Sequence, residues 1–353
     1  MKQLWQQLLN LFRANKVKNR DREDISISFM TEKKVGLGED APPLLIQKGK
    51  ACAVGVFDGM GGAGATTCNS SIGDGHTQAY VSSRIVCSSM DIFLQNHLPT
   101  DDIAAEDMKA VIKHKLHEEK EAFPPKVMSS LRSKLVRDYP TTLAIVTLQE
   151  YEKTYQVDSY WAGDSHCYLW TKRGFFQISK DDLEDNIDPM ENLHNDSPIS
   201  NCICADRDFS IHHKSIPLPK EPIIILCATD GCFGYYQTPM HFEYVLKSCL
   251  QEADNKEEWK TKIKNMILRV TGDDCSLSLI AVGFSSFEEL KKSMKDNAVE
   301  GFPKLLNQEV TISYFEKELA NEKERYEQNV TTGWGKYKTN YMKYIKDEDN
   351  GNA

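Results

Sequence analysis

Residues 51–62 read Ala-Cys-Ala-Val-Gly-Val-Phe-Asp-Gly-Met-Gly-Gly, an apolar run that closes on an aspartate and a glycine-rich turn. The run has the length and the bounds of a buried β-strand. Asp58 therefore stands at a strand end inside a core, where a carboxylate without a partner is costly. The glycines allow a tight turn, so a main-chain carbonyl can face the same partner as the Asp58 side chain.

Three further aspartates stand at comparable places. Asp230 ends the run Ile-Ile-Ile-Leu-Cys-Ala-Thr-Asp, Asp164 lies in Tyr-Trp-Ala-Gly-Asp-Ser, and Asp273 precedes the run from Cys275 to Phe284. Taken alone, Asp58 could equally belong to a plain Asp-Gly turn that closes a hairpin. Several carboxylates gathered at the strand ends of one core need a cation, and hard divalent ions take oxygen ligands. The set predicts a metal-dependent enzyme.

Composition narrows the class of protein. The 353 residues carry a formal net charge of −9, which argues against a nucleic-acid partner. The apolar stretch 4–12 is too short for a signal or a membrane span, and we interpret 1–18 as an amphipathic helix packed on its own domain. The basic residues after it leave a surface-binding helix as the alternative. We expect a cytoplasmic protein that does not enter the membrane.

The ten cysteines show no pairing framework, and four of them, Cys52, Cys167, Cys227 and Cys275, lie in apolar runs where we expect reduced, buried thiols. The closest pair, Cys202 and Cys204, lacks the spacing and the second pair typical of a zinc site.

Local patterns predict an α+β fold. Runs rich in β-branched and aromatic residues predict seven strands, and apolar residues at helical spacing predict helices between them. The strands are expected at 25–29, 51–57, 142–148, 155–161, 167–170, 223–228 and 277–284, and the helices around 86–94, 108–116 and 259–270. This order suits a four-layer α-β-β-α sandwich, in which two antiparallel sheets are flanked by helices. We expect loops at 63–76 and 181–201, the second being a flap, and a charged helical extension at 285–353.

Taken together, the motifs resemble the metal-dependent Ser/Thr protein phosphatases of the PPM or type 2C family. Six matches fall in the family's order across about residues 19–284, which we interpret as the phosphatase domain. They are Arg20-Asp21-Arg22-Glu23-Asp24, Asp58-Gly59-Met60-Gly61-Gly62, Pro140-Thr141-Thr142-Leu143, Gly163-Asp164-Ser165, Asp230-Gly231 and Asp273-Asp274-Cys275-Ser276.

The resemblance implies roles for these residues. Asp58 would bridge two Mn²⁺ or Mg²⁺ ions, Glu23 and the Gly59 carbonyl would complete the shell of one, and Asp230 and Asp273 would hold the other. Asp164, with Asp230, could serve a third ion. Asp24 would hold water bound to the metal. A hydroxide that bridges the ions would attack phosphorus in line, without a covalent phospho-enzyme.

The chain departs from the family pattern at several positions. Ala63 stands where many members carry a proton-donating His, and His76 follows in the next loop. Asn19 stands where many members carry a phosphate-gripping Arg. Arg20 or Lys18 beside it could take that role, and Arg20 offers the bidentate geometry. His166 and Asp274 replace the usual Arg and Asn, and neither looks like a metal ligand.

Two functions of different classes stay open. The first is metal-dependent hydrolysis of phosphoserine and phosphothreonine in a partner protein, with a Ser/Thr kinase or its targets among the partners, by a monomer. The alternative is a weakly active or inactive phosphatase-like domain that acts as a protein-binding regulatory module. A nuclease is a distant third, because no basic groove interleaved with aromatic residues is visible.

Overall fold

The computed structural model describes residues 25–99, 103–124, 136–185, 188–194, 197–295 and 302–343. The chain forms two compact units, Met1–Ala298 and Val299–Ala353. The predicted helix at 1–18 and the predicted site residues Arg20, Glu23 and Asp24 lie outside the described residues.

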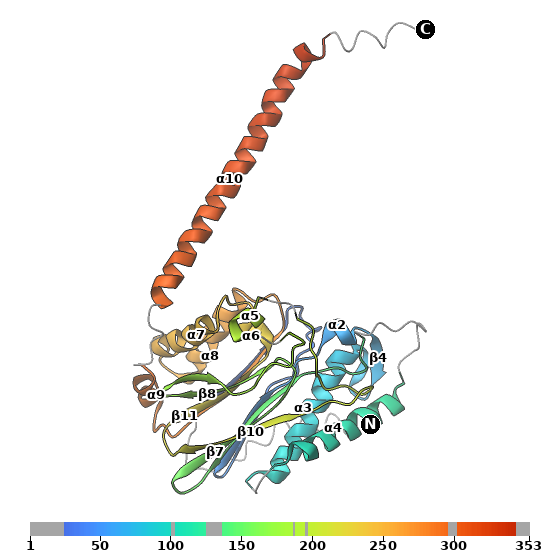
Figure 1. Cartoon of the computed structure of the whole chain (residues 1–353), viewed down its shortest axis with the longest axis vertical. Helices are drawn as coiled ribbons and strands as arrows, with labels where there is room; N and C mark the ends of the chain where they lie inside the picture. The colour runs from blue at the N-terminus through green and yellow to red at the C-terminus, as the bar shows by residue number, and fades with distance from the viewer. Residues whose placement is uncertain are drawn as a thin grey trace. The chain divides into compact units, whose positions relative to one another are not determined.

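The first unit contains two five-stranded sheets in which every neighbouring pair is antiparallel (Figure 1). One sheet has the order β1-β12-β11-β8-β9, and the other has the order β10-β7-β6-β3-β2. The strands of the first are β1 (Ile25–Thr31), β12 (Cys275–Val282), β11 (Ile223–Ala228), β8 (His166–Thr171) and β9 (Gly174–Gln177). Those of the second are β10 (His212–Pro219), β7 (Thr154–Ala162), β6 (Leu143–Glu150), β3 (Ala51–Val56) and β2 (Leu44–Lys48).

Three apolar clusters build the layers. Val54, Val146, Leu169 and Ile225 belong to a cluster between the two sheets. A second cluster joins the outer face of the first sheet to α7 (Pro239–Glu252) and α8 (Lys256–Leu268), and a third joins the other sheet to α3 (Gln78–His97) and α4 (Ala105–Ala122). β11 and β12 are buried at every position because both of their faces are covered. The predicted four-layer sandwich is confirmed (Figure 1).

Three of the helices begin next to a residue whose side chain caps the helix N-terminus. Thr77 and Thr238 cap α3 and α7 by accepting hydrogen bonds from Tyr80 N and His241 N, and Pro239 occupies the first turn of α7. Asn255 caps α8 through Glu257 N and Glu258 N. The short helices are α2 (Gly61–Gly64), α5 (Pro189–Asn192), α6 (Asp230–Phe233) and α9 (Phe287–Ser293).

All seven predicted strands exist, but the prediction of a loop over 63–76 is wrong. Its residues form the end of α2 and an antiparallel hairpin of β4 (Thr67–Ser70) and β5 (Gly73–Thr77). Ser70 Oγ donates to Gly73 O across the turn, at 2.5 Å. The strands are short and half-exposed, so they carry no apolar run for sequence reasoning to detect. The strands β2, β9 and β10 and the helix α7 were also not predicted.

In the second unit, α10 (Phe302–Tyr341) is a single helix of 40 residues. α9 and α10 both lie within the range 285–353 of the expected extension. None of the described helices has the length and apolarity needed to cross a bilayer. All ten cysteines are buried and none forms a disulfide.

Candidate functional site

The antiparallel order brings the predicted aspartates to one end of the sandwich. Asp58 follows the end of β3, Asp164 lies between β7 and β8, and Asp230 follows β11. β12 begins at Cys275, so Asp273 precedes it at the same end, where Cys275 pairs with Thr31. The pairings Val56↔Ala144, Leu143↔Ala162 and Ala228↔His166 align these strand ends with one another.

A pocket of about 350 Å³ lies at this end and collects the carboxylates. Its lining includes four of the predicted aspartates together with the Gly59 turn. The lining residues are Glu39, Asp58, Gly59, Met60, Gly61, Gly62, Ala63, Thr142, Asp164, Ile199, Asp230, Asp273 and Asp274. Among the described residues no Lys, Arg or His lines the pocket.

Two threonines fix the Asp58 turn. Thr141 Oγ1 donates to Asp58 O at 2.6 Å, and Thr142 N donates to the same carbonyl at 2.8 Å. Asp58 N in turn donates to Thr142 Oγ1 at 3.2 Å, and that hydroxyl is paired with Ser165 Oγ at 2.7 Å. The Thr-Thr and Gly-Asp-Ser motifs therefore hold the turn from two neighbouring strands.

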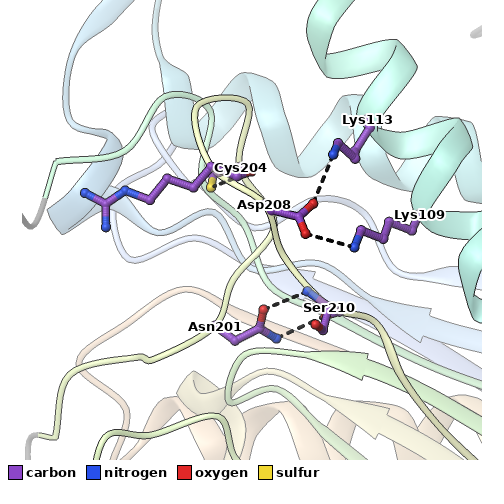
Figure 2. A network of polar contacts seen from close by, with 7 residues as sticks. Lys109, Lys113, Asn201, Cys204, Asp208 and Ser210 are labelled. Atoms are coloured by element: carbon purple, nitrogen blue, oxygen red, sulfur yellow. Dashed lines mark hydrogen bonds and ion pairs between the residues drawn. The ribbon is translucent and has the colours of Figure 1, made fainter.

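The loop that carries Ile203 supports the same turn from outside, because Thr141 and Ile203 exchange two backbone hydrogen bonds of 3.0 Å. Figure 2 shows how this loop is fastened: Asn201 and Ser210 bond to each other, and Asp208 reaches Lys109 and Lys113 on α4. Asp208 is 71% exposed, so these ion pairs contribute little to stability and mainly orient the loop.

Close backbone approaches explain two of the glycines. A Cβ on Gly231 would lie 1.8 Å from Asp274 O. The Asp230 turn therefore packs directly against the backbone that precedes β12. A Cβ on Gly61 would lie 1.7 Å from Glu39 Oε2, so the Glu39 carboxylate occupies the space that a side chain would fill.

Glu39 and Asp40 are site residues that sequence reasoning missed. Glu39 lines the pocket, and its Oε1 accepts a hydrogen bond from Thr77 Oγ1 at 2.5 Å. Asp40 is 1% exposed, and its Oδ2 accepts a hydrogen bond from Thr229 Oγ1 at 3.0 Å. Its Oδ1 has no hydrogen-bond partner among the described residues. An orphaned, buried carboxylate oxygen is costly unless a cation or ordered water completes it.

The buried carboxylates raise one another's pKa. Burial raises the pKa of Asp58 well above its ordinary value, and the charges of Asp40, Asp230 and Asp164 raise it further. The pKa of Asp40 is raised by burial and then by Asp230, and that of Asp230 is raised by burial. Burial and the charge of Asp230 raise the pKa of Asp164 to about 8. The site holds more negative charge than its surroundings stabilise.

The carboxylates of Asp273 and Asp274 make different hydrogen bonds. Asp274 Oδ1 and Oδ2 accept hydrogen bonds from Lys33 N at 2.7 Å and Glu39 N at 2.6 Å, so this carboxylate fixes the chain that leads to Glu39. Asp273 Oδ1 accepts from Asp274 N at 2.9 Å.

The two histidines singled out in the sequence are engaged elsewhere. His76 stacks on Tyr80, with ring centroids 4.0 Å apart, and does not line the pocket. His166 is buried, with Nε2 2.7 Å from Asp181 Oδ1 and Nδ1 2.6 Å from the Tyr168 hydroxyl. Burial alone would raise the pKa of Asp181, but His166 beside it brings that pKa below its usual value.

The donor set fits a hard divalent cation. All its groups are carboxylate, carbonyl or hydroxyl oxygens, which Mg²⁺ and Mn²⁺ prefer. Within the described part of the chain, no three His, Cys, Asp or Glu side chains stand so that they alone could hold an ion. Mg²⁺ keeps several of its waters and takes only one or two carboxylates directly, so the arrangement suits ions bound partly through water.

The comparisons with known proteins agree with this picture. A family model described as Protein phosphatase 2C matches residues 37–268. No curated protein sequence matches the chain significantly.

Three solved structures share the fold. A bacterial serine phosphatase superposes with a TM-score of 0.52 at 16% identity, covering 74% of this chain and 98% of its own. The Ser/Thr phosphatase Stp1 from Staphylococcus aureus gives 0.51 at 16% identity, covering 74% and 95%. A C. elegans sex determining protein gives 0.56 at 10% identity, covering 83% and 74%. At such identities the likeness shows the fold alone.

Proposed function

The chain belongs to the protein phosphatase 2C family, and on that premise we propose that it is a divalent-metal-dependent phosphatase acting on phosphoserine and phosphothreonine in proteins. The observation that carries the proposal is the pocket in which Asp58, Asp164, Asp230 and Glu39 converge beside the buried Asp40. Family membership indicates the reaction class, and the oxygen donors that line the pocket indicate that a metal ion binds there.

We propose that Glu39 and Asp40 fill the roles expected from the sequence for Glu23 and Asp24. Asp58, the Gly59 carbonyl, Asp230 and Asp273 would bind two Mn²⁺ or Mg²⁺ ions, with Asp164 available to a third. When bound, such ions lower the pKa of coordinated water and neutralise charge on a phosphoryl group. The threonine pair behind Asp58 holds the backbone of the Asp58 turn, which lines the pocket.

The residues around the pocket lead us to expect slow turnover on phosphoprotein. No basic side chain of the described residues lines the pocket to grip phosphate, and Ala63 offers no proton to the leaving group. The loss of a general acid typically costs about 10²- to 10⁴-fold. A serine or threonine alkoxide needs that proton more than a phenolate does, so an aryl phosphate should be the better substrate.

The test is hydrolysis of an aryl phosphate with Mn²⁺, with and without chelator, for wild type, Asp58→Asn and Asp230→Asn. We expect metal-dependent turnover in wild type and losses of at least about 100-fold in both variants. Asp74→Asn, at an exposed position on β5, is the matched control and should keep wild-type activity. Wild-type turnover that is unaffected by chelator, or equal to that of the Asp58 variant, would sink the proposal.

The alternative is a phosphatase-like module that binds a protein partner without efficient catalysis. The same two features favour it: a pocket lining without a cation among the described residues, and Ala63. If calorimetry detects metal binding and the hydrolysis assay detects no turnover, this alternative is favoured over the phosphatase. A partner kinase, a cytoplasmic location and the boundaries 19–284 and 285–353 stay predictions.

A further inference from the structure

The helix α10 carries a row of large apolar side chains that is exposed to solvent. Its members are between 46% and 70% exposed. They are Ile312, Phe315, Leu319, Tyr326, Val330, Trp334, Tyr337 and Tyr341, and we call them the α10 stripe. A scattered exposed apolar residue needs no explanation, but eight of them along one face of a helix mark an interaction surface.

The spacing places all eight side chains on one face. Successive members are three, four or seven residues apart, which at 3.6 residues per turn confines them to an arc of roughly 100°. From Ile312 to Tyr341 the stripe is about 44 Å long, at 1.5 Å per residue. At its C-terminal end the ring centroids of Tyr337 and Tyr341 lie 5.7 Å apart, and each ring also contacts Trp334.

Part of the α10 sequence is poorly suited to an isolated helix, so we expect packing against a partner to stabilise it. Residues 331–335 read Thr-Thr-Gly-Trp-Gly, and glycine and threonine are poor helix formers. Among the described residues, a Cβ on Gly333 or Gly335 would meet nothing within 4 Å, so no contact within the helix accounts for either glycine. Helices of this kind are stabilised mainly by packing of their apolar face.

The charges beside the stripe differ between its two halves. Residues 311–327 contain five glutamates and three basic residues, whereas 328–343 contain three lysines and no acidic residue. A second copy aligned in parallel would place the lysine-rich halves side by side. An antiparallel copy places each acidic half against a basic half, so opposite charges meet at both ends.

We propose that α10 is a dimerisation helix that pairs antiparallel with α10 of a second copy of this chain. In this register Ile312 lies opposite Tyr341, Leu319 lies opposite Trp334, and Tyr326 lies at the twofold axis. Glu316 and Lys338 then flank the seam on the same side and meet across it. The sequence had led us to expect a monomer, and this proposal departs from that expectation.

The surface is large enough for a stable pair. If each stripe side chain loses on the order of 100 Å² of exposed surface, the two copies together bury roughly 1,600 Å², the size of a standard protein interface. The aromatic content of the stripe is typical of the buried centre of such interfaces.

The first experiment measures the mass of the full chain in solution by analytical ultracentrifugation over a range of concentrations. We expect a dimer for wild type and at least a tenfold weaker dimer for Tyr326→Gln. Tyr314→Gln is the matched control, since Tyr314 is a 60% exposed tyrosine on the opposite face of the same helix. A monomeric wild type, or equal weakening by both variants, overturns the proposal.

The second experiment tests the direction of pairing with disulfides. α10 contains no native cysteine, and all ten native cysteines are buried, so the wild type serves as the uncrosslinked control. We expect Ile312→Cys and Tyr341→Cys to crosslink to each other when mixed, and neither to itself. Crosslinking of each variant to itself would overturn the antiparallel arrangement.

Charge exchange provides an independent check. Glu316→Lys should weaken the dimer, and the double variant Glu316→Lys, Lys338→Glu should restore it. Wild-type protein that stays monomeric but binds neutral lipid vesicles through α10 would assign the stripe to a membrane surface and overturn the proposal. Hydrolysis of the aryl phosphate is measured beside each variant, and it should not change, so this proposal and the proposed activity fail separately.

Discussion

Asp164→Asn should stabilise the metal-free protein at neutral and alkaline pH and leave its stability nearly unchanged in acid. Burial and the charge of Asp230 raise the pKa of Asp164 from 3.8 to about 8 in the folded chain. Between those two values the folded state binds more protons than the unfolded state, so the free energy of unfolding falls as pH rises. An asparagine does not ionise, so the variant lacks this loss.

The size of the effect follows from the shift. Four pKa units correspond to roughly 5 kcal/mol at about 1.36 kcal/mol per unit. This is an upper limit, because Asp164 and Asp230 titrate together and removing one charge relieves the other. We expect a gain of about 2 kcal/mol at pH 8, which for a domain of this size raises Tm by about 4–8 °C.

The assay is thermal unfolding in chelator at pH 4.5 and pH 8, for wild type, Asp164→Asn and the exposed control Asp74→Asn. The difference between wild type and Asp164→Asn should be near zero at pH 4.5 and largest at pH 8. Mn²⁺ should reduce it, because a bound cation neutralises the charge that the substitution removes. An equal difference at both pH values, or a lower Tm for the variant at pH 8 in chelator, would refute the electrostatic account of the site.

Three further predictions concern the scaffold and the proton donor. Gly231→Ala should lose several kcal/mol of unfolding free energy in urea titrations and weaken Mn²⁺ binding, because its Cβ would lie 1.8 Å from Asp274 O. Thr142→Val should cost about 1–3 kcal/mol in the same titration, since it leaves the buried Ser165 hydroxyl without its partner. His76→Ala should keep aryl-phosphate turnover within about twofold of wild type, because the ring lies outside the pocket; a 100-fold loss would instead make it the proton donor.

Much of the fold was readable because its central strands are long and apolar. β3, β6, β11 and β12 are buried over most or all of their length, so hydrophobic runs mark them clearly. β10 alternates between half-buried and exposed residues, and the hairpin β4–β5 is largely exposed, so both lack that signal. The helix α7 packs on one face of the first sheet. It was missed because the apolar periodicity of its sequence is only moderate.

Glu39-Asp40 could be identified as an acidic pair of the site only once the strand topology was known. Two Glu-Asp pairs precede strands, Glu23-Asp24 before β1 and Glu39-Asp40 before β2. β2 pairs antiparallel with β3 from Leu44↔Gly55, so the chain that enters β2 lies beside the chain that leaves β3, and Ala41 N donates to Phe57 O at 2.9 Å.

β1, in contrast, reaches the pocket end of its sheet with its last residue. Thr31 pairs with Cys275 there, while Ile25 pairs with Ala281 at the other end of β12, about 20 Å away at 3.3 Å per residue. The rule that identifies Glu39-Asp40 is geometric. In an antiparallel hairpin the residues before the first strand meet those after the second, and Glu39-Asp40 stands in that relation to Asp58. The hairpin went unrecognised because β2, five residues long, follows two prolines and carries a mixed apolar and polar sequence.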